Sequence, residues 1–154
     1  MKMRPLLLLS LRVALGAVFV VSGFQKLVAP YQNFAAVIEK FELLGAAQSA
    51  ILARTLPWAE LIAGVFFILG FWERISLFIL WAMNTVFLGA LASTLARKLA
   101  IDSCGCFGEA VTLSVPQILA IDGVLWALFL VYFFANRRSI APGLDKNFGA
   151  HAAP

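Results

Sequence analysis

The chain has 154 residues, of which 62% are hydrophobic and 13% are charged, and its mean hydropathy is +0.93. A soluble domain is nearer half apolar and a quarter charged, so this composition excludes a chain that is soluble by itself. The formal net charge is +4, but the basic residues are scattered at the ends of apolar segments, which excludes a nucleic-acid-binding patch and is typical of a membrane protein.

Four long apolar stretches lie at residues 6–24, 55–72, 75–96 and 116–135. Each is long enough to cross a hydrocarbon core of about 30 Å as a helix. None of them alternates polar and apolar residues as a barrel strand would, and only helices and closed barrels satisfy the backbone in lipid. We therefore predict an all-α integral membrane protein, with a bundle of four transmembrane helices in a single domain over residues 1–138.

The first stretch has one feature of a signal peptide, because Lys2 and Arg4 precede it. However, Arg12 lies inside the apolar run, and the run is longer than the usual signal-peptide core of about 7–15 residues. We expect a membrane helix that is retained. Arg12 is then a structural charge, which either snorkels to the membrane interface or pairs with Glu73.

The connection between the first two stretches carries apolar residues at helical spacing, with charged residues mostly opposed. The apolar positions are Phe34, Val37, Ile38, Phe41 and Leu44. We expect an amphipathic helix in the first extracytoplasmic loop, ending at Gly45. It either buries its apolar side on the rim of the bundle or lies on the membrane surface.

The remaining connections differ in length. Trp72, Glu73 and Arg74 form a tight turn, so the second and third helices should pack as antiparallel neighbours. Residues 139–154 are small and polar and include Pro and Gly, and we expect this tail to be disordered. His151, the only histidine, lies in the tail, and we do not expect it to be catalytic.

Four spans place both termini on one side of the membrane. Six basic residues fall on that side and five on the other, which favours termini in the cytoplasm. The first group is Lys2, Arg4, Arg74, Arg137, Arg138 and Lys146, and the second is Lys26, Lys40, Arg54, Arg97 and Lys98. The connection before the last helix is then periplasmic, where disulfides persist.

Polar residues inside apolar spans usually face the bundle interior or water. On the predicted topology, Lys26, Glu60 and Asp122 converge in depth near the outer ends of their helices, while Asn84 lies in the middle of the third. One interpretation is structural, with Lys26 pairing with a carboxylate and Asn84 bonding across helices. The other is functional, with these residues forming a proton route or the polar floor of a cofactor pocket.

The two cysteines lie together in the segment IDSCGCFG, as Cys104 and Cys106. Two extended residues span about 7 Å, and a disulfide needs Cα atoms about 4.4–6.8 Å apart. The pair can therefore form a bridge only if the chain bends at Gly105, which has no Cβ to prevent it. A strained, exposed disulfide is suited to exchange rather than to stapling. We expect a redox-active pair.

Two alternatives remain for the cysteines. A metal such as Cu(I) suits two thiolates, but zinc requires about four ligands and no further cysteine or histidine lies nearby in the sequence. We therefore predict no metal site. The second alternative is a pair of free, unreactive thiols.

Three segments resemble one known family. RVALGAVFVVSGFQKL, LPWAELIAGVFFILGFWER and DSCGCFG are similar to the methylamine-utilisation protein MauE family, within the wider DoxX-like membrane proteins. The resemblance covers about residues 10–135, and its most specific element is Cys104, Gly105, Cys106, Phe107 and Gly108. Arg12, Lys26 and Glu60 match the more general helix patterns. Ser103 departs from the pattern, in which aspartate is expected directly before the first cysteine.

The resemblance implies a four-helix protein of the bacterial cytoplasmic membrane, acting beside a periplasmic thioredoxin-like partner. It implies a role in disulfide formation during maturation of methylamine dehydrogenase, whose small subunit has many disulfides. We expect a membrane thiol–disulfide oxidoreductase that passes electrons between that partner and a membrane acceptor, which we expect to be a quinone. The alternatives are a non-catalytic scaffold or assembly factor and a small-molecule or metal transporter, and a homo-oligomer is compatible with each.

Overall fold

The computed structural model of the chain describes residues 3–97 and 115–136, and these residues form five α-helices and no strands. The helices are α1 (Met3–Val28), α2 (Tyr31–Lys40), α3 (Ala46–Leu69), α4 (Glu73–Ala96) and α5 (Val115–Asn136). All except α2 are long and apolar enough to cross a membrane. The prediction of an all-α protein with four membrane spans is confirmed.

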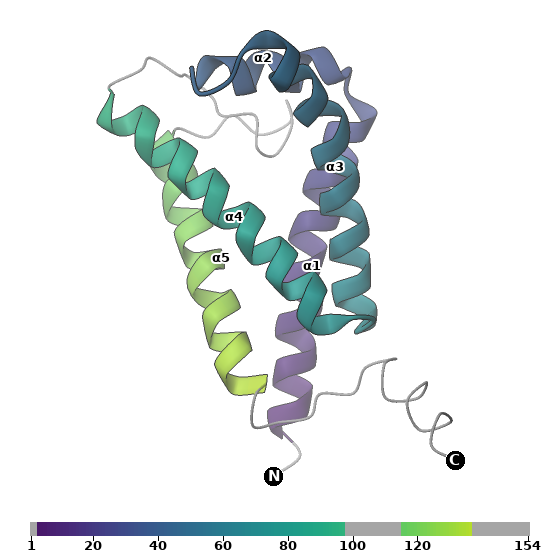
Figure 1. The fold of residues 1–154 in the computed structure, drawn as a ribbon. Helices are drawn as coiled ribbons and strands as arrows, with labels where there is room; N and C mark the ends of the chain where they lie inside the picture. The colour runs from purple at the N-terminus through teal and green to yellow at the C-terminus, as the bar shows by residue number, and fades with distance from the viewer. Residues whose placement is uncertain (1–2, 98–114, 137–154) are drawn as a thin grey trace.

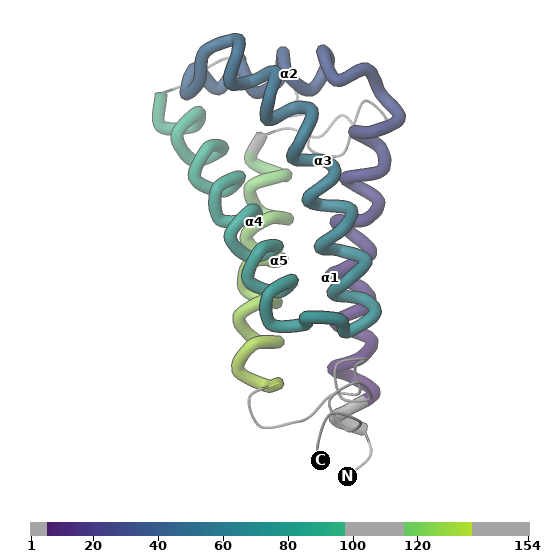
Figure 2. Tube along the Cα trace, turned by 45° about the vertical axis from the view of Figure 1, so that its right-hand side comes forward, coloured from purple at the N-terminus to yellow at the C-terminus, as the bar shows by residue number. Residues whose placement is uncertain are grey.

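The four long helices run lengthwise through the molecule, and α2 lies across one end of them (Figure 1). α1 pairs with α3, and α4 pairs with α5, as the turned view also shows (Figure 2). The start of α1 and the end of α5 lie together at the end opposite α2. We call these the α2 end and the termini end.

Glycines allow α1 and α3 to pack closely. A Cβ on Gly23 would lie 2.8 Å from the carbonyl oxygen of Pro57, and a Cβ on Gly64 would lie 3.1 Å from that of Gly16. The distance at Gly23 is shorter than a Cβ contact allows, and the distance at Gly64 is tighter than most such contacts, so the two backbones approach each other closely at these glycines. This close approach brings the side chains of the two helices within direct reach of each other.

An aromatic cluster fills the centre of the bundle. The ring of Phe129 lies 5.7 Å from that of Phe19 and 6.1 Å from that of Phe67, and Tyr132 packs edge-on against Phe67 at 5.3 Å. Many large apolar side chains on the outside are exposed, including Phe24, Trp58 and Val86. A soluble monomer rarely exposes so much apolar surface, whereas lipid accommodates it.

Several predicted boundaries are wrong, and α1 continues to Val28 rather than ending at residue 24. α3 begins at Ala46 rather than at residue 55, because the helix continues through Pro57 instead of starting there. α2 ends at Lys40 rather than at Gly45, since Glu42 takes a left-handed conformation with φ of 52°. The turn between α3 and α4 lies before Glu73 rather than over residues 72–74.

Two residues of the turn between α3 and α4 have a left-handed backbone conformation. Gly70, with φ of 69°, ends α3, and Trp72, with φ of 46°, precedes α4. Glycine takes such a conformation without steric cost, which explains the helix stop. α3 and α4 are joined directly by this turn and pack against each other, as the sequence predicted for antiparallel neighbours.

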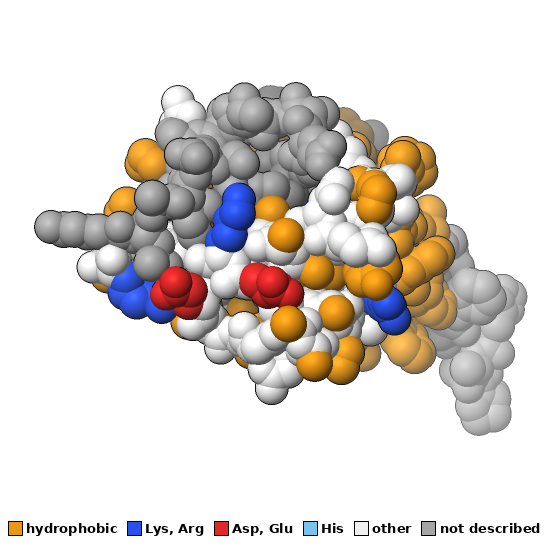
Figure 3. Space-filling view, turned by 90° about the horizontal axis from the view of Figure 1, so that it is seen from above, with side chains coloured by type: hydrophobic (Ala, Val, Ile, Leu, Met, Phe, Trp, Pro, Cys, Tyr) orange, Lys and Arg blue, Asp and Glu red, His pale blue; other side chains and the backbone are white. Residues whose placement is uncertain are grey.

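α2 covers the end of the bundle. Its apolar residues Phe34, Ala35 and Ile38 are buried against α3, while Glu39 and Lys40 are exposed. Of the two interpretations of the amphipathic pattern, burial on the rim of the bundle is therefore the one observed. Figure 3, which views the molecule from this end, shows acidic and basic side chains among the apolar ones.

Candidate functional site

A buried polar cavity lies under α2, and all four long helices contribute to it. Its volume is about 30 Å³. The polar lining residues are Ser22 and Lys26 from α1, Glu60 from α3, Asn84 from α4 and Asp122 from α5. The sequence predicted that Lys26, Glu60 and Asp122 lie at a similar depth, and in the structure all three line one cavity.

The strongest contact in the cavity joins Lys26 to Glu60. Lys26 Nζ lies 2.7 Å from Glu60 Oε1 and 2.9 Å from Oε2, and both side chains are only 2% exposed. Ser22, one helical turn before Lys26, donates a hydrogen bond of 3.3 Å to Glu60 Oε2. The close packing at Gly23 is what allows these side chains to meet across the α1–α3 contact.

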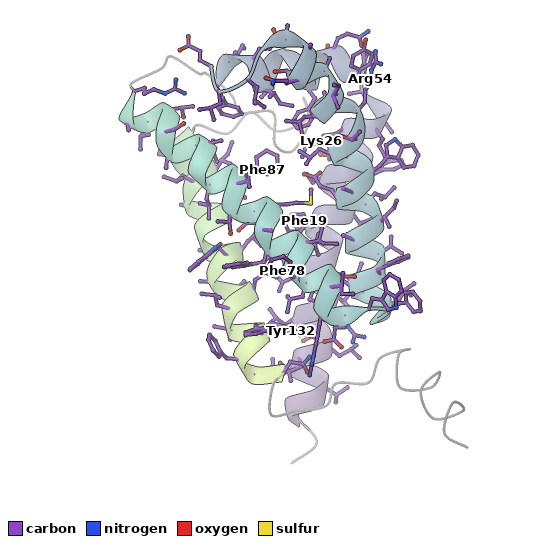
Figure 4. The ribbon with its side chains drawn as sticks, in the orientation of Figure 1. Phe19, Lys26, Arg54, Phe78, Phe87 and Tyr132 are labelled. Atoms are coloured by element: carbon purple, nitrogen blue, oxygen red, sulfur yellow. The ribbon has the colours of Figure 1, made fainter. Side chains whose placement is uncertain are left out.

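Aromatic rings enclose the ammonium group of Lys26. Its Nζ lies 4.9 Å from the ring centre of Phe34 and 5.1 Å from that of Phe87, which is within the range of a cation–π interaction. Phe34 belongs to α2, so the helix that covers the bundle also seals this site. Figure 4 shows Lys26 and Phe87 near the α2 end, with Phe19 closer to the middle of the bundle.

The remaining polar groups of the cavity are not fully paired. Asn84 Oδ1 is buried and accepts no hydrogen bond from any described residue, so a cross-helix hydrogen bond to this oxygen is not observed. Asp122 lies close enough to interact electrostatically with both Lys26 and Glu60. A polar cavity of about 30 Å³ has room for about one water molecule, which would satisfy Asn84.

The charges of the cavity do not cancel. One ammonium group, on Lys26, faces two carboxyl groups, on Glu60 and Asp122. If all three ionise, the cluster carries one net negative charge, and an uncompensated charge inside a membrane protein is costly. One bound proton makes the cluster neutral. The arrangement can therefore take up and release a proton.

Arg12 belongs to a different cluster, at the termini end. Its Nη1 lies 3.7 Å from Glu73 Oε2, so of the two predicted arrangements pairing is the one observed. Tyr132 also donates a hydrogen bond to Glu73, and Asn136 donates one of 2.7 Å. These contacts connect α1, α4 and α5, in keeping with the structural role expected for Arg12.

The five residues of the Cys-Gly-Cys element, from Cys104 to Gly108, lie outside the described residues. The helices that flank this segment are described. α4 ends at Ala96 and α5 begins at Val115, and both of these helix ends lie at the α2 end of the bundle (Figure 1). The chain therefore leaves and rejoins the bundle at the end where the polar cavity lies.

The sequence did not predict that Ser22 and Phe87 line the cavity or that Phe34 encloses the ammonium group of Lys26. Ser22 was detectable, because it precedes Lys26 by four residues and shares its helix face. Phe34 and Phe87 gave no such signal, since an aromatic residue in an apolar helix is ordinarily part of the core. Among the described residues, no group of three or more His, Cys, Asp or Glu side chains is placed to hold a metal ion.

The family model described as methylamine utilisation protein MauE matches residues 4–135, which include nearly all of the four long helices and the Cys-Gly-Cys segment. No curated protein matches the chain, and no solved structure does.

Proposed function

The chain belongs to the MauE family of methylamine utilisation proteins and has four helices that can span a membrane, and from this premise we propose that it is a membrane thiol–disulfide redox protein. In this proposal, Cys104 and Cys106 exchange electrons with a thioredoxin-like protein in the periplasm. The exchange supports disulfide formation in a periplasmic protein, for which methylamine dehydrogenase is the candidate that the family suggests.

The exchange is balanced when it is written in the oxidising direction. A thiolate of the partner attacks a sulfur of the Cys104–Cys106 disulfide, which breaks as a mixed disulfide forms. The second thiol of the partner then displaces the chain's cysteine. The partner gains a disulfide, and the chain gains two electrons and two protons as a dithiol. The Cys104–Cys106 disulfide would re-form when the two electrons and two protons pass to a second acceptor, for which a membrane quinone, reduced to a quinol outside the polar cavity, is the candidate class.

The observation that supports this proposal best is the position of the cavity. Thiol oxidation releases protons, and the cluster of Lys26, Glu60 and Asp122 can hold one. It lies in the half of the bundle nearer the end where the cysteine segment joins α4 and α5. Its charge imbalance, which a purely structural ion pair does not need, favours the functional interpretation.

A quinone does not fit the polar cavity. About 30 Å³ accommodates one water molecule and not a substituted ring. We therefore assign Lys26, Glu60, Asp122 and Asn84 to proton handling rather than to the floor of a quinone pocket.

The test is thiol trapping on intact cells with a membrane-impermeant, mass-adding maleimide. We expect no labelling of the wild-type chain until it is reduced. We expect Cys104→Ser or Cys106→Ser to trap a mixed disulfide with another protein, and the double variant to lose partner oxidation while keeping its helix content. Ser103→Ala is the matched control, because it changes the same segment without removing a thiol.

Two results would contradict the proposal. The first is full partner oxidation by the double serine variant, which would assign the chain to the scaffold class. The second is free labelling of both thiols without reduction, which would show that no disulfide rests there and would favour unreactive thiols or a metal site.

One observation favours the scaffold alternative. The exposed side of α2 carries Gln32, Asn33, Glu39 and Lys40 at the α2 end, where it is available to a partner protein. If the chain only docks a partner, reversing the charges of Glu39 and Lys40 should abolish activity, and the serine variants should keep it. The redox proposal predicts the larger loss for the serine variants.

A further inference from the structure

A second cavity opens between α4 and α5 in the half of the bundle nearer the termini end. Its volume is about 250 Å³, and its lining is apolar apart from one charged residue. The residues that line it are Arg74, Leu77, Phe78, Trp81, Phe129, Leu130 and Phe133. We call this cavity the α4–α5 groove. Figure 4 shows Phe78 and Tyr132 at this level, well separated from Lys26.

The groove is separate from the polar cavity. Phe129 lines the groove and packs against Phe19, whose ring lines the polar cavity. An aromatic layer therefore divides the two sites. Phe78 and Phe133 are exposed, so the groove opens sideways to the surroundings of the bundle. In a membrane those surroundings are lipid chains, and an apolar gap that is left empty forfeits packing on every side.

The mouth of the groove is polar. A further space of about 200 Å³, lined by Glu73, Arg74, Leu77, Phe133 and Asn136, shares three of these residues with the groove and continues it towards the termini end. Glu73 is occupied by its contacts with Arg12, Tyr132 and Asn136. Arg74 is exposed and makes no hydrogen bond or ion pair with any described residue. Arg12, Glu73 and Arg74 together leave one positive charge at the mouth.

We propose that the α4–α5 groove binds one anionic phospholipid, with its phosphate on Arg74 and an acyl chain against Leu77, Trp81 and Leu130. Arg74 and Trp81 are seven residues apart on α4, which is a rise of about 10 Å along the helix. A lipid with its phosphate on Arg74 therefore places its acyl chain beside Trp81. An arginine near a helix end extends its charge to the headgroup level while its stem stays in the apolar region. The proposal is independent of the redox function.

Charge complementarity favours a phospholipid over the other amphiphiles. A quinone carries no charge to match Arg74, and the groove lies in the half of the bundle away from the helix ends that flank the cysteine segment. A zwitterionic lipid would fill the apolar part but bring its own cation to the mouth. One basic residue near the membrane surface favours an anionic lipid by about fivefold.

Trp81 provides a direct test, because brominated acyl chains quench the fluorescence of a tryptophan that they touch. The variant Trp58→Phe, Trp72→Phe, Trp126→Phe keeps only Trp81. In vesicles with increasing brominated phosphatidylglycerol, we expect half-quenching at about a fivefold lower mole fraction than with brominated phosphatidylcholine. A variant that keeps only Trp58, which is exposed on α3, should show no such preference.

Two pairs of variants, each a test and its control, and one solution condition locate the site. Arg74→Gln should remove the headgroup preference, whereas Lys40→Gln, at the other end of the molecule, should retain it. Leu130→Phe, inside the groove, should weaken quenching by both lipids, and Val131→Phe, on the exposed side of α5, should not. High salt should reduce the preference of the unmodified groove, because the contact to phosphate is electrostatic.

The proposal is overturned if both lipids quench Trp81 equally, which would indicate ordinary boundary lipid. It is also overturned if Arg74→Gln keeps the preference in a folded protein. A third result excludes it as well, namely quenching that appears only after residues 139–154 are removed. In that case the chain's own C-terminal segment occupies the groove.

Discussion

Lys26 is the only cation among the described residues that line the polar cavity, and this makes its loss different from the loss of either carboxylate. Lys26→Met leaves two buried carboxyl groups without a counter-charge, and we expect the free energy of unfolding to fall by about 3–5 kcal/mol. Glu60→Gln leaves one cation and one anion, with an expected loss of about 1–2 kcal/mol. Asp122→Asn keeps the 2.7 Å ion pair and should change stability by less than about 1 kcal/mol.

The ranking can be measured by denaturation of the three variants in detergent micelles, with exposed Lys40→Met as the control for loss of a lysine. Equal destabilisation by Lys26→Met and Asp122→Asn would contradict the charge count.

The sequence predicted which charged residues meet, because costly charges in apolar spans must find one another. It did not distinguish Glu60 from Asp122 as the partner of Lys26, because that choice depends on helix rotation and on Gly23.

The Asp122→Asn variant should lose activity while its stability changes little. Because Asp122→Asn removes one proton-binding group and leaves the Lys26–Glu60 pair in place, we expect partner oxidation to slow by at least about tenfold. The resting redox state of the cysteine pair, measured by thiol trapping, should remain as in the wild-type chain. Normal oxidation rates in a folded Asp122→Asn variant would show that the cluster is structural only.

At the scale of the helices, the contact between α1 and α3 is the element pair on which the site depends. A Cβ on Gly23 would meet backbone atoms of Pro57 and Leu61 at 2.8 and 3.0 Å, and backbone cannot move aside. We expect Gly23→Ala to destabilise the bundle by about 1–3 kcal/mol. Thermal unfolding in detergent measures the change.

The chain supplies matched controls for that substitution. A Cβ on Gly89 or Gly123, in α4 and α5, would meet nothing within 4 Å. Alanine favours a helix over glycine by up to about 1 kcal/mol, so Gly89→Ala and Gly123→Ala should be neutral or stabilising. Similar destabilisation by all three substitutions would mean that glycine flexibility, and not close packing, is required.

The helices themselves were largely predictable, and their ends were not. Length and hydropathy located all four spans, because the cost of unpaired backbone in lipid leaves few alternatives. The start of α3 was missed by nine residues, since its first turns are alanine-rich and Pro57 resembles a helix start. The helix nevertheless extends to Ala46, because alanine favours a helix and because those turns pack under α2, where Ala53 is buried.

For the whole molecule, the distribution of charged residues between its two ends predicts the orientation in the membrane. The α2 end has exposed residues of both charges. The termini end includes Arg74, and Arg137 and Arg138 follow directly in the sequence after α5, which ends there. Basic residues concentrate on the cytoplasmic side of membrane proteins. We therefore predict that the termini lie in the cytoplasm and that α2 faces the periplasm.

Single cysteines in a background without Cys104 and Cys106 test this orientation. An impermeant maleimide should label Lys40→Cys on intact cells, because Lys40 is exposed on α2, and should label Trp72→Cys only after lysis, because Trp72 is exposed in the turn at the termini end. Labelling of both cysteines after lysis is the control for accessibility. The reverse pattern would place the α2 end, and with it the helix ends that flank the cysteine segment, in the cytoplasm. A reducing compartment does not sustain a resting disulfide, so that outcome would remove the basis for exchange with a periplasmic partner.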